Sequence, residues 1–379
     1  MPVQTSFDRG IAPGDPIDSL ETPAVIVRTD VMDRNIDRFA EMAADCGVRL
    51  RSHVKNHKIP ALAHEQHRRT DDGGVVCQTL EEVEVMAAAG IDDLYLTRMV
   101  VSERKLERLA RIAEGVESFT ATVDCPANLD RLAAAARNHG ITVPVIMEVD
   151  IGYERTGVPP GEPAAALATA IDDTDGVDFA GILAFEGFVR GTADTPDEFE
   201  AHSLAAMDRT AETVDQIEAA GLAVREVKVG CTATARFSAT HPVVTEINPG
   251  TYPFNDVAEL GYRGDVIDKT DCAMTILTTV VSTPTPDRAI VDAGSKSIAI
   301  PEGRMPIPKQ RSDIDYYDAS EEHGWVTTSD ATEPVSVGDR LELIPPRASP
   351  TVNLHDAVIG VQDGEVETVW DVQARGAVR

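Results

Sequence analysis

The chain contains 379 residues, which is long enough for a large barrel domain and a smaller second domain with a sizeable buried core. Its 64 acidic side chains outnumber its 34 lysines and arginines, which gives a formal net charge of −30. This balance argues against nucleic acid or an anionic membrane surface as a partner. Only seven of the cationic residues are lysines. Excess carboxylate with scarce lysine keeps a protein hydrated in high salt, so we expect an intracellular protein of a salt-loving organism.

The cysteines and the amino terminus bear on the compartment. The cysteines are odd in number and show no CxxC spacing, which argues against a disulfide framework or a structural zinc site and favours a reducing cytoplasm. No cationic segment followed by an apolar run opens the chain, and no stretch has about 18 uninterrupted apolar residues. We therefore expect neither a secretory signal nor a membrane span. The cysteines are Cys46, Cys77, Cys125, Cys231 and Cys272.

From residue 21 to residue 256, short β-branched runs alternate with helical segments that carry apolar residues at three-to-four spacing. Several of these helical segments begin with Asp, Ser or Asn and end at Gly, as helix ends favour. Eight such βα units in succession predict an α/β fold, a TIM-like (β/α)8 barrel. The expected strands are 24–28, 48–53, 75–79, 94–98, 119–124, 143–150, 179–186 and 224–229.

Beyond residue 257 the helical period disappears and strand-like runs follow one another, with turn residues between them. We therefore expect a separate β domain over 257–379, which residues 1–20 join. The polar segment 305–324 predicts a long loop within this domain.

Chemistry in such a barrel is expected at the carboxyl ends of the strands. The second strand leads into Lys55, which has a histidine on either side at His53 and His57. An amine at this place can form a Schiff base if its neighbours and partial desolvation lower its pKa. The alternative is a solvated basic patch. Of the two histidines, His53 is the one that we expect near a cofactor, and His57 is expected to be structural.

Two further strand ends carry candidate binding groups. Arg155 lies in a tight glycine-flanked loop after the sixth strand, where it can face a ring nitrogen or an anion, or else form an ion pair with Asp150 or Glu148. After the eighth strand, 230–234 is a run of small residues that can expose backbone N–H groups to a phosphate. A phosphate anchor and an aldehyde anchor at one barrel mouth are the two fixtures that pyridoxal 5′-phosphate needs.

Several segments resemble one enzyme family in order along nearly the whole chain. They include RSHVKNHK (51–58), EVDIGYERTGV (148–158), VGCTATA (229–235), EINPGTYPFND (246–256) and IPPRASPTVNLHD (344–356). The chain is similar to the fold-type III pyridoxal-phosphate enzymes with an alanine racemase-like barrel, and within them to the D-threonine aldolase and D-serine dehydratase group. The resemblance implies a homodimer and a lyase that acts on a small D-3-hydroxy amino acid.

The resemblance also implies roles for single residues. Lys55 would be the Schiff-base lysine, and Arg155 would approach the pyridine nitrogen of the cofactor. His53 and Gln78 would lie near the cofactor. The residues around its phosphate would be Gly230, Cys231, Thr232 and Tyr252.

Two departures from the family pattern affect the expected mechanism. Metal-dependent members have a His and a Cys or Asp, two residues apart, where this chain has Arg347 and Ser349. Arginine is no metal ligand, so we expect no divalent metal at the family site. Arg347 would instead bind a substrate carboxylate or phosphate, or only form a salt bridge. The second departure is Phe188, which stands where the family has a histidine after its seventh strand.

Two other functions stay open at the sequence level. A pyridoxal-phosphate racemase or epimerase needs bases on both faces of Cα but no metal. A non-catalytic carrier of the cofactor resembles the bare barrel, so the β domain of this chain argues against it.

Overall fold

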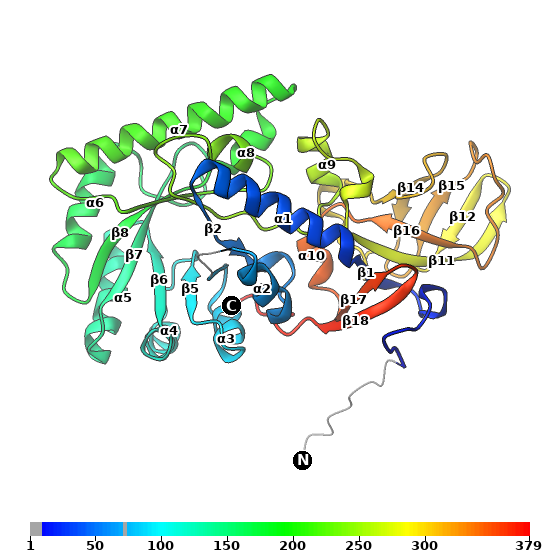
Figure 1. Cartoon of the computed structure of the whole chain (residues 1–379), viewed down its shortest axis with the longest axis horizontal. Helices are drawn as coiled ribbons and strands as arrows, with labels where there is room; N and C mark the ends of the chain where they lie inside the picture. The colour runs from blue at the N-terminus through cyan, green and yellow to red at the C-terminus, as the bar shows by residue number, and fades with distance from the viewer. Residues whose placement is uncertain (1–9, 71–73) are drawn as a thin grey trace, which may run out of the picture. The chain divides into compact units, whose positions relative to one another are not determined.

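A computed structural model describes residues 10–70 and 74–379, which divide into two compact units whose elements are labelled in Figure 1. The first unit consists of the described residues up to Asn35 together with Pro253–Arg375, and the second of Ile36–Tyr252 together with Gly376–Arg379. Residues 1–9, which we expected to join the β domain, lie outside the described residues. No described helix is both long and apolar enough to cross a membrane.

The second unit is built around a parallel sheet that closes on itself. Its strand order is β2-β10-β9-β8-β7-β6-β5-β4-β3. The strands at the two ends of this order, β2 and β3, are separated in the chain by Arg51 alone, so together they act as one strand. The predicted TIM-like barrel is confirmed. Its strands are β2 (Arg49–Leu50), β3 (Ser52–His53), β4 (Val75–Cys77), β5 (Asp93–Leu96), β6 (Ser118–Val123), β7 (Val143–Val149), β8 (Val177–Ala184), β9 (Glu226–Val229) and β10 (Glu246–Ile247).

The barrel helices begin and end at residues that favour helix ends. Proline occupies the first turn of α2, α5, α6 and α7, where its missing N–H costs nothing. Gly140 ends α5 in the left-handed conformation, with φ of 69°. The helices are α1 (Thr29–Cys46), which has residues in both units, α2 (Pro60–Arg68), α3 (Leu80–Ala88), α4 (Glu103–Gly115), α5 (Pro126–His139), α6 (Glu162–Asp172), α7 (Pro196–Ala219) and α8 (Ala235–Ser238).

One predicted barrel strand belongs to the other unit. The strand β1 (Ala24–Arg28) pairs with β11 (Met274–Thr285) and β17 (Ala357–Gln362), so the prediction that 24–28 is the first barrel strand is wrong. The remaining barrel position is taken by β10, which pairs with β9 and β2. A two-residue strand has no periodicity, and an apolar run such as β1 fits either sheet. The pattern therefore indicated the number of strands but not their membership.

The barrel interior contains a buried network of charges beside its apolar core. Nζ of Lys228 lies 2.9 Å from Oε1 of Glu246, and Nε of Arg51 lies 3.2 Å from Oε2 of Glu246. Burial alone would raise the pKa of Glu246, but the charges of Lys228 and Arg51 outweigh it and lower the pKa to about 2. Arg51 is therefore an interior ion-pair partner and not part of a solvated basic patch. The packed apolar cluster of the unit is Val76, Tyr95, Ile146, Ala180 and Leu183.

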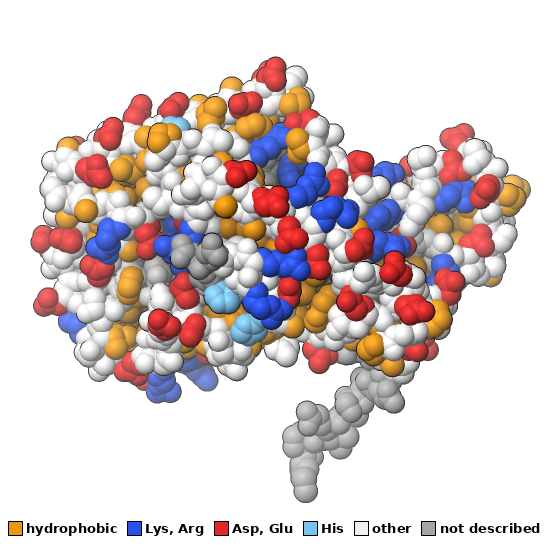
Figure 2. Space-filling model, viewed as in Figure 1, with side chains coloured by type: hydrophobic (Ala, Val, Ile, Leu, Met, Phe, Trp, Pro, Cys, Tyr) orange, Lys and Arg blue, Asp and Glu red, His pale blue; other side chains and the backbone are white. Residues whose placement is uncertain are grey.

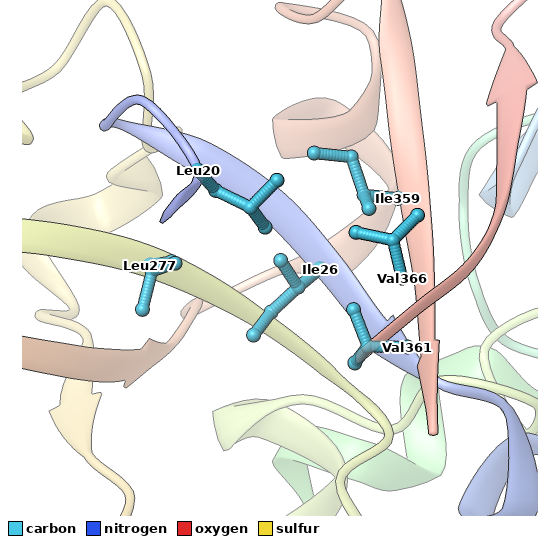
Figure 3. Packing of buried hydrophobic residues seen from close by; sticks show 6 residues of the cluster. All are labelled: Leu20, Ile26, Leu277, Ile359, Val361 and Val366. Carbon is cyan, nitrogen blue, oxygen red and sulfur yellow. The ribbon is translucent and has the colours of Figure 1, made fainter. Parts of the chain in front are cut away.

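The first unit is a mostly antiparallel sheet with the order β14-β15-β12-β11-β1-β17-β18, and β16 pairs with both β11 and β13. Apolar side chains from β1, β11, β17 and β18 pack together with Leu20 (Figure 3). Its other elements are η1 (Ile17–Ser19), α9 (Val257–Arg263), η4 (Lys269–Asp271), β12 (Arg288–Val291), η5 (Pro301–Gly303), β13 (Ile307–Pro308), β14 (Asp315–Ala319), β15 (Gly324–Thr327), β16 (Arg340–Ile344), α10 (Ala348–Val352) and β18 (Glu365–Asp371).

The prediction of a long loop over 305–324 is wrong in part, because this segment contains β13 and β14. The strand β14 lies at the end of the strand order, and most of its side chains face solvent. Tyr316 is its buried residue, and the Tyr316 hydroxyl donates to the carbonyl oxygen of Ala293 at 2.9 Å. Polar side chains are usual on an edge strand, and they make its sequence look like a loop.

Candidate active site

Lys55 lies just beyond the carboxyl end of β3, in the short helix η2 (Val54–Asn56). Its Nζ donates to Oε1 of Gln78 at 3.4 Å, and the same oxygen lies 3.3 Å from Nε2 of His53. Gln78 directly follows β4, the strand next to β3. Two neighbouring strand ends therefore bring together three of the predicted site residues, an amine, an amide and an imidazole.

The surroundings of Lys55 favour its uncharged form. Burial lowers the pKa of Lys55 to about 8, the charges of Arg155 and Arg190 contribute in the same direction, and Glu82 opposes them. Burial and the charge of Lys55 hold the pKa of His53 well below its usual value. A neutral amine is a nucleophile and a neutral imidazole does not compete with it for protons, so the pair suits attack on a carbonyl carbon.

The second flanking histidine is tied into the structure. Nε2 of His57 lies 3.0 Å from Oε1 of Gln66, and Nδ1 of His57 accepts from the backbone N–H of Ile59 at 3.0 Å. Burial lowers the pKa of His57 to about 4, so this ring is neutral near pH 7. These contacts support the structural role expected for His57.

Arg155 follows β7 and lies between two aromatic rings. Its guanidinium carbon is 4.8 Å from the ring centroid of Tyr153 and 4.8 Å from that of Phe185. One guanidinium nitrogen lies 3.4 Å from Oε1 of Glu148, so one of the two expected ion-pair partners is present. The other, Asp150, accepts instead from the backbone N–H groups of the loop between it and Arg155. The loop thereby holds a cation whose side chain stays half exposed.

The small-residue loop after β9 is fixed by Glu186, a buried carboxylate that the sequence analysis did not single out. Oε2 of Glu186 accepts from the N–H of Gly230 at 2.9 Å, and Oε1 accepts from the hydroxyls of Thr234 at 2.7 Å and Ser238 at 2.9 Å. A Cβ at Gly230 would lie 2.7 Å from the backbone nitrogen of Asn248. Gly230 therefore permits a close backbone approach, while its N–H is already used by Glu186.

Other residues predicted at the phosphate lie in or beside this loop. The hydroxyl of Thr232 accepts from the N–H of Thr251 at 3.0 Å and is buried. The sulfur of Cys231 lies 3.2 Å from the hydroxyl oxygen of Thr234. The loop therefore carries backbone amides, hydroxyls and a thiol at the carboxyl end of β9. Nothing in the sequence of this loop points to Glu186.

Tyr252 has a different environment from the one expected. Its side chain is fully buried, with a ring centroid 4.4 Å from that of Phe39. The hydroxyl lies 2.7 Å from the Ser52 hydroxyl and accepts from Nε2 of Gln66 at 2.9 Å. Burial raises the pKa of Tyr252 to about 12, so the phenol stays protonated. Since two side chains already occupy this hydroxyl, contact with a phosphate stays a prediction.

A second carboxylate missed from the sequence supports Gln78. Oε2 of Glu82 accepts from the backbone N–H of Gln78 at 2.7 Å, and its Oε1 lies 2.5 Å from Nζ of Lys58. Nζ of Lys58 also donates to the carbonyl oxygen of Ala377, in the terminal segment that ends beside α2 and α3 (Figure 1). The sequence signal was available, because Thr79 and Glu82 have the spacing of a capping box, which α3 forms.

Two family models together match most of the chain. The family model described as alanine racemase, N-terminal domain, matches residues 27–256, and a serine dehydratase domain model matches residues 273–361. The chain is 35% identical to a 3-hydroxy-D-aspartate aldolase of Paracoccus denitrificans, covering 98% of this chain and 97% of the relative. It belongs to the fold-type III pyridoxal-phosphate family.

Further members of the family support the assignment over the full length. A D-threonine aldolase from an Arthrobacter species is 33% identical and covers 98% of both chains. The crystal structure of a D-threonine aldolase from Filomicrobium marinum superimposes with a TM-score of 0.92 at 35% identity, covering 97% of this chain and 99% of the other. The close relatives are pyridoxal-phosphate lyases, and the chain shares both of their domains.

The barrel residues fit the family cofactor. Lys55 supplies an amine with a lowered pKa for an aldehyde, Arg155 a cation for a ring nitrogen, and the loop after β9 amide and hydroxyl donors for a phosphate. Among the described residues, both amide atoms of Asn56 and Oδ1 of Asn248 are buried without a hydrogen-bond partner. Asn56 adjoins Lys55 and Asn248 packs against Gly230, so polar atoms that need a partner flank both expected anchors.

The family's metal positions fall in the first unit. Arg347 is the residue before α10, and a buried carboxylate, Asp256, accepts from the neighbouring Ala348 N–H at 2.9 Å. Burial raises the pKa of Asp256 and the charge of Arg347 partly offsets this. Within residues 10–70 and 74–379, no cluster of three His, Cys, Asp or Glu side chains is arranged to hold a metal ion. The effect of the Arg347 charge on Asp256 supports an ion-pair role for Arg347.

Proposed function

We propose that this chain is a pyridoxal-phosphate-dependent lyase that acts on a D-3-hydroxy amino acid, by breaking the Cα–Cβ bond or by eliminating the β-hydroxyl. The observation that carries the proposal is the amine of Lys55, with its lowered pKa, held by Gln78 beside Arg155 at the barrel mouth. The aldolases of Paracoccus and Arthrobacter, similar over nearly their whole lengths, support the class of substrate.

Bound pyridoxal phosphate supplies a conjugated ring that withdraws electrons from the bonds at Cα of an amino acid. Within this chemistry Lys55 holds the cofactor and moves a proton at the substrate, for which a pKa of about 8 leaves both protonation states accessible. Arg155, a permanent cation, would disfavour a positive charge on the ring nitrogen of the cofactor. Gln78 and His53 orient the Lys55 amine. The residues that would hold the phosphate are Gly230, Cys231, Thr232 and Tyr252.

The proposal includes a reaction without a divalent metal at the family position. Arg347 and Ser349 stand where ligands are expected, and a guanidinium repels a cation instead of binding it. Arg347 would then supply positive charge to an anionic group of the substrate, while the effect of its charge on the pKa of Asp256 supports the simpler role of an ion pair.

The test uses purified holoprotein, Lys55→Ala and the matched control Lys296→Ala, whose parent lysine is exposed. Because Lys55 is the proposed attachment point, the wild type and the control should show the visible absorbance of bound cofactor and a covalent adduct after borohydride reduction. Both features should be lost in Lys55→Ala. Wild type should convert a D-3-hydroxy amino acid to an aldehyde and glycine, or to a keto acid and ammonia.

Two further measurements separate the remaining alternatives. In deuterated water a racemase would return the inverted amino acid with label at Cα, and this result would replace the lyase proposal. Activity that survives dialysis against a chelator supports the metal-free reaction, whereas activity that is lost and restored by a divalent metal would contradict it. A protein that exchanges cofactor but converts no D- or L-amino acid would be a carrier.

We also propose a homodimer and a cytoplasmic location. The homodimer is supported by the family resemblance and can be measured by sedimentation, where a monomer at working concentration would contradict it. The five cysteines are free, which fits a reducing compartment.

A further inference from the structure

Arg190 is a second arginine at the end of a barrel strand for which the cofactor has no evident use. It lies in η3 (Gly187–Gly191), which begins three residues after the end of β8 at Ala184, and is half-buried. Its Nε donates to the carbonyl oxygen of Gly187 at 3.0 Å, which folds the guanidinium back over the start of the turn. A Cβ at Gly187 would lie 3.3 Å from Nη2 of Arg190 and 2.4 Å from the ring of Phe185.

Arg190 is linked through this turn to Arg155. The Phe185 ring that borders Gly187 on one side lies 4.8 Å from the guanidinium carbon of Arg155. Glu186, between Phe185 and Gly187, directs its carboxylate to the loop after β9. The charges of Arg155 and Arg190 also lower the pKa of Lys55 in the same direction.

The proposed cofactor contacts do not include Arg190. Of the proposed cofactor contacts, Lys55 takes the aldehyde, Arg155 the ring nitrogen and the loop after β9 the phosphate. An amino acid substrate brings at least one carboxylate, and a guanidinium binds a carboxylate through two parallel N–H···O bonds. In a chain with a net charge of −30, a local pair of cations is also what draws an anionic substrate to the site.

We propose that Arg190 binds a carboxylate of the amino acid substrate. The proposal rests on the proposed lyase function. The carboxylate is either the one on Cα, which every amino acid has, or a side-chain carboxylate, which only a dicarboxylic substrate has. Both carboxylates would bind the guanidinium in the same way. They differ in which substrates need Arg190 for binding.

The experiment compares the holoenzymes of wild type, Arg190→Gln, Arg190→Lys and the matched control Arg209→Gln. Arg209 packs on Phe188 of the same turn, with its guanidinium carbon 5.5 Å from the ring centroid. The probes are 3-hydroxy-D-aspartate, D-threonine and, as a competitive inhibitor, the amino alcohol threoninol, which has no carboxylate.

We expect Arg190→Gln to raise the KM for 3-hydroxy-D-aspartate about 10- to 100-fold, the loss typical of a charged hydrogen bond. A similar rise for D-threonine identifies the Cα carboxylate, and no rise identifies the side-chain carboxylate. Inhibition by threoninol and all constants of Arg209→Gln should stay within about threefold of wild type. Arg190→Lys keeps the positive charge that lowers the pKa of Lys55, so the pH dependence of its activity should match that of wild type. This variant therefore separates a loss of substrate binding from a changed titration of Lys55.

Two outcomes would overturn the assignment of Arg190. One is an unchanged KM for both carboxylate substrates, and the other is a loss of threoninol inhibition as large as the rise in KM. If the wild type itself converts none of these compounds, the proposed lyase function fails, and the result is then distinct from a failure of the assignment.

Discussion

Glu186 shows how one buried carboxylate can organise a loop of the candidate site. Its two oxygens accept from one backbone N–H and two hydroxyls, all on the segment 230–238. Burial raises the pKa of Glu186, and these hydrogen bonds only partly offset the cost of the buried charge. Glu186 therefore fixes the geometry of this loop at the cost of a buried charge.

This cost makes stability depend on pH at a single residue. A raised pKa means that the folded protein favours the protonated form, so the stability that this form supplies is lost as pH rises above 4.5, the usual value. Glu186→Gln removes the charge, but its NH2 group also replaces one acceptor oxygen with a donor, a change whose cost does not depend on pH. We therefore expect the stability of Glu186→Gln relative to wild type to increase as pH rises from about 5 to about 8. Glu186→Ala leaves three donors without an acceptor and should cost about 2 kcal/mol or more. Urea unfolding of the apoprotein at both pH values measures the two effects, and a pH-independent difference for the Gln variant would refute the argument.

Arg347 can be tested against its two roles by measuring stability and binding on one variant. If Arg347 contacts the substrate, Arg347→Gln should raise KM about tenfold or more. The free energy of unfolding should then fall by less than about 1 kcal/mol, because the arginine is half exposed. If Arg347 only neutralises Asp256, Arg347→Gln should clearly lower the free energy of unfolding and leave KM unchanged.

The residues that could be predicted from the sequence are those whose partners lie at the next strand end. Lys55, His53 and Gln78 follow two consecutive barrel strands, so the chain order alone brings them together. Glu186 could not be found in this way, because its partner Gly230 is 44 residues away and nothing in either segment points to the other. The same holds for Arg190, whose sequence context is an unremarkable turn.

At the level of elements, the limit of prediction was the assignment of strands to sheets. The run at 24–28 has the composition of a barrel strand, yet its neighbours in the structure are β11 and β17, about 250 and 330 residues further along. The amphipathic helix α1 follows it directly and has residues in both units. Local pattern specifies strand and helix, whereas long-range pairing specifies the sheet, and one sequence contains only the first kind of information.

The cap of α3 is an element whose stability supports the site. Thr79 accepts from the N–H of Glu82 and donates to the carbonyl oxygen of Ala377 at 3.1 Å, and it directly follows Gln78. We expect Thr79→Ala to lower the free energy of unfolding by about 1–2 kcal/mol, since it removes the cap. Thr79→Ser keeps the hydroxyl and should stay within about 0.5 kcal/mol of wild type. Denaturant unfolding tests this, and equal losses in both variants would assign the effect to the methyl group instead.

At the scale of the whole molecule, the dominant feature is the excess of carboxylates. Acidic side chains are spread over the face shown in Figure 2, with lysines and arginines between them, and do not gather in a single patch. A net charge of −30 acts as general self-repulsion that opposes the compact state. This interpretation gives the expected adaptation to high salt a physical test.

Screening should stabilise this protein, and most of the gain should come early. The Debye length falls from about 10 Å at about 0.1 M salt to about 3 Å at about 1 M, where repulsion between separated surface charges is largely removed. We expect the midpoint of thermal unfolding to rise by about 5 °C over this range of potassium chloride, and to rise more slowly beyond it. Solute exclusion would instead give a gain that continues in proportion to concentration, as a sucrose series can show. A midpoint that stays constant or falls below about 1 M salt would mean that the carboxylates do not limit stability, and the salt-loving interpretation of the composition would be lost with it.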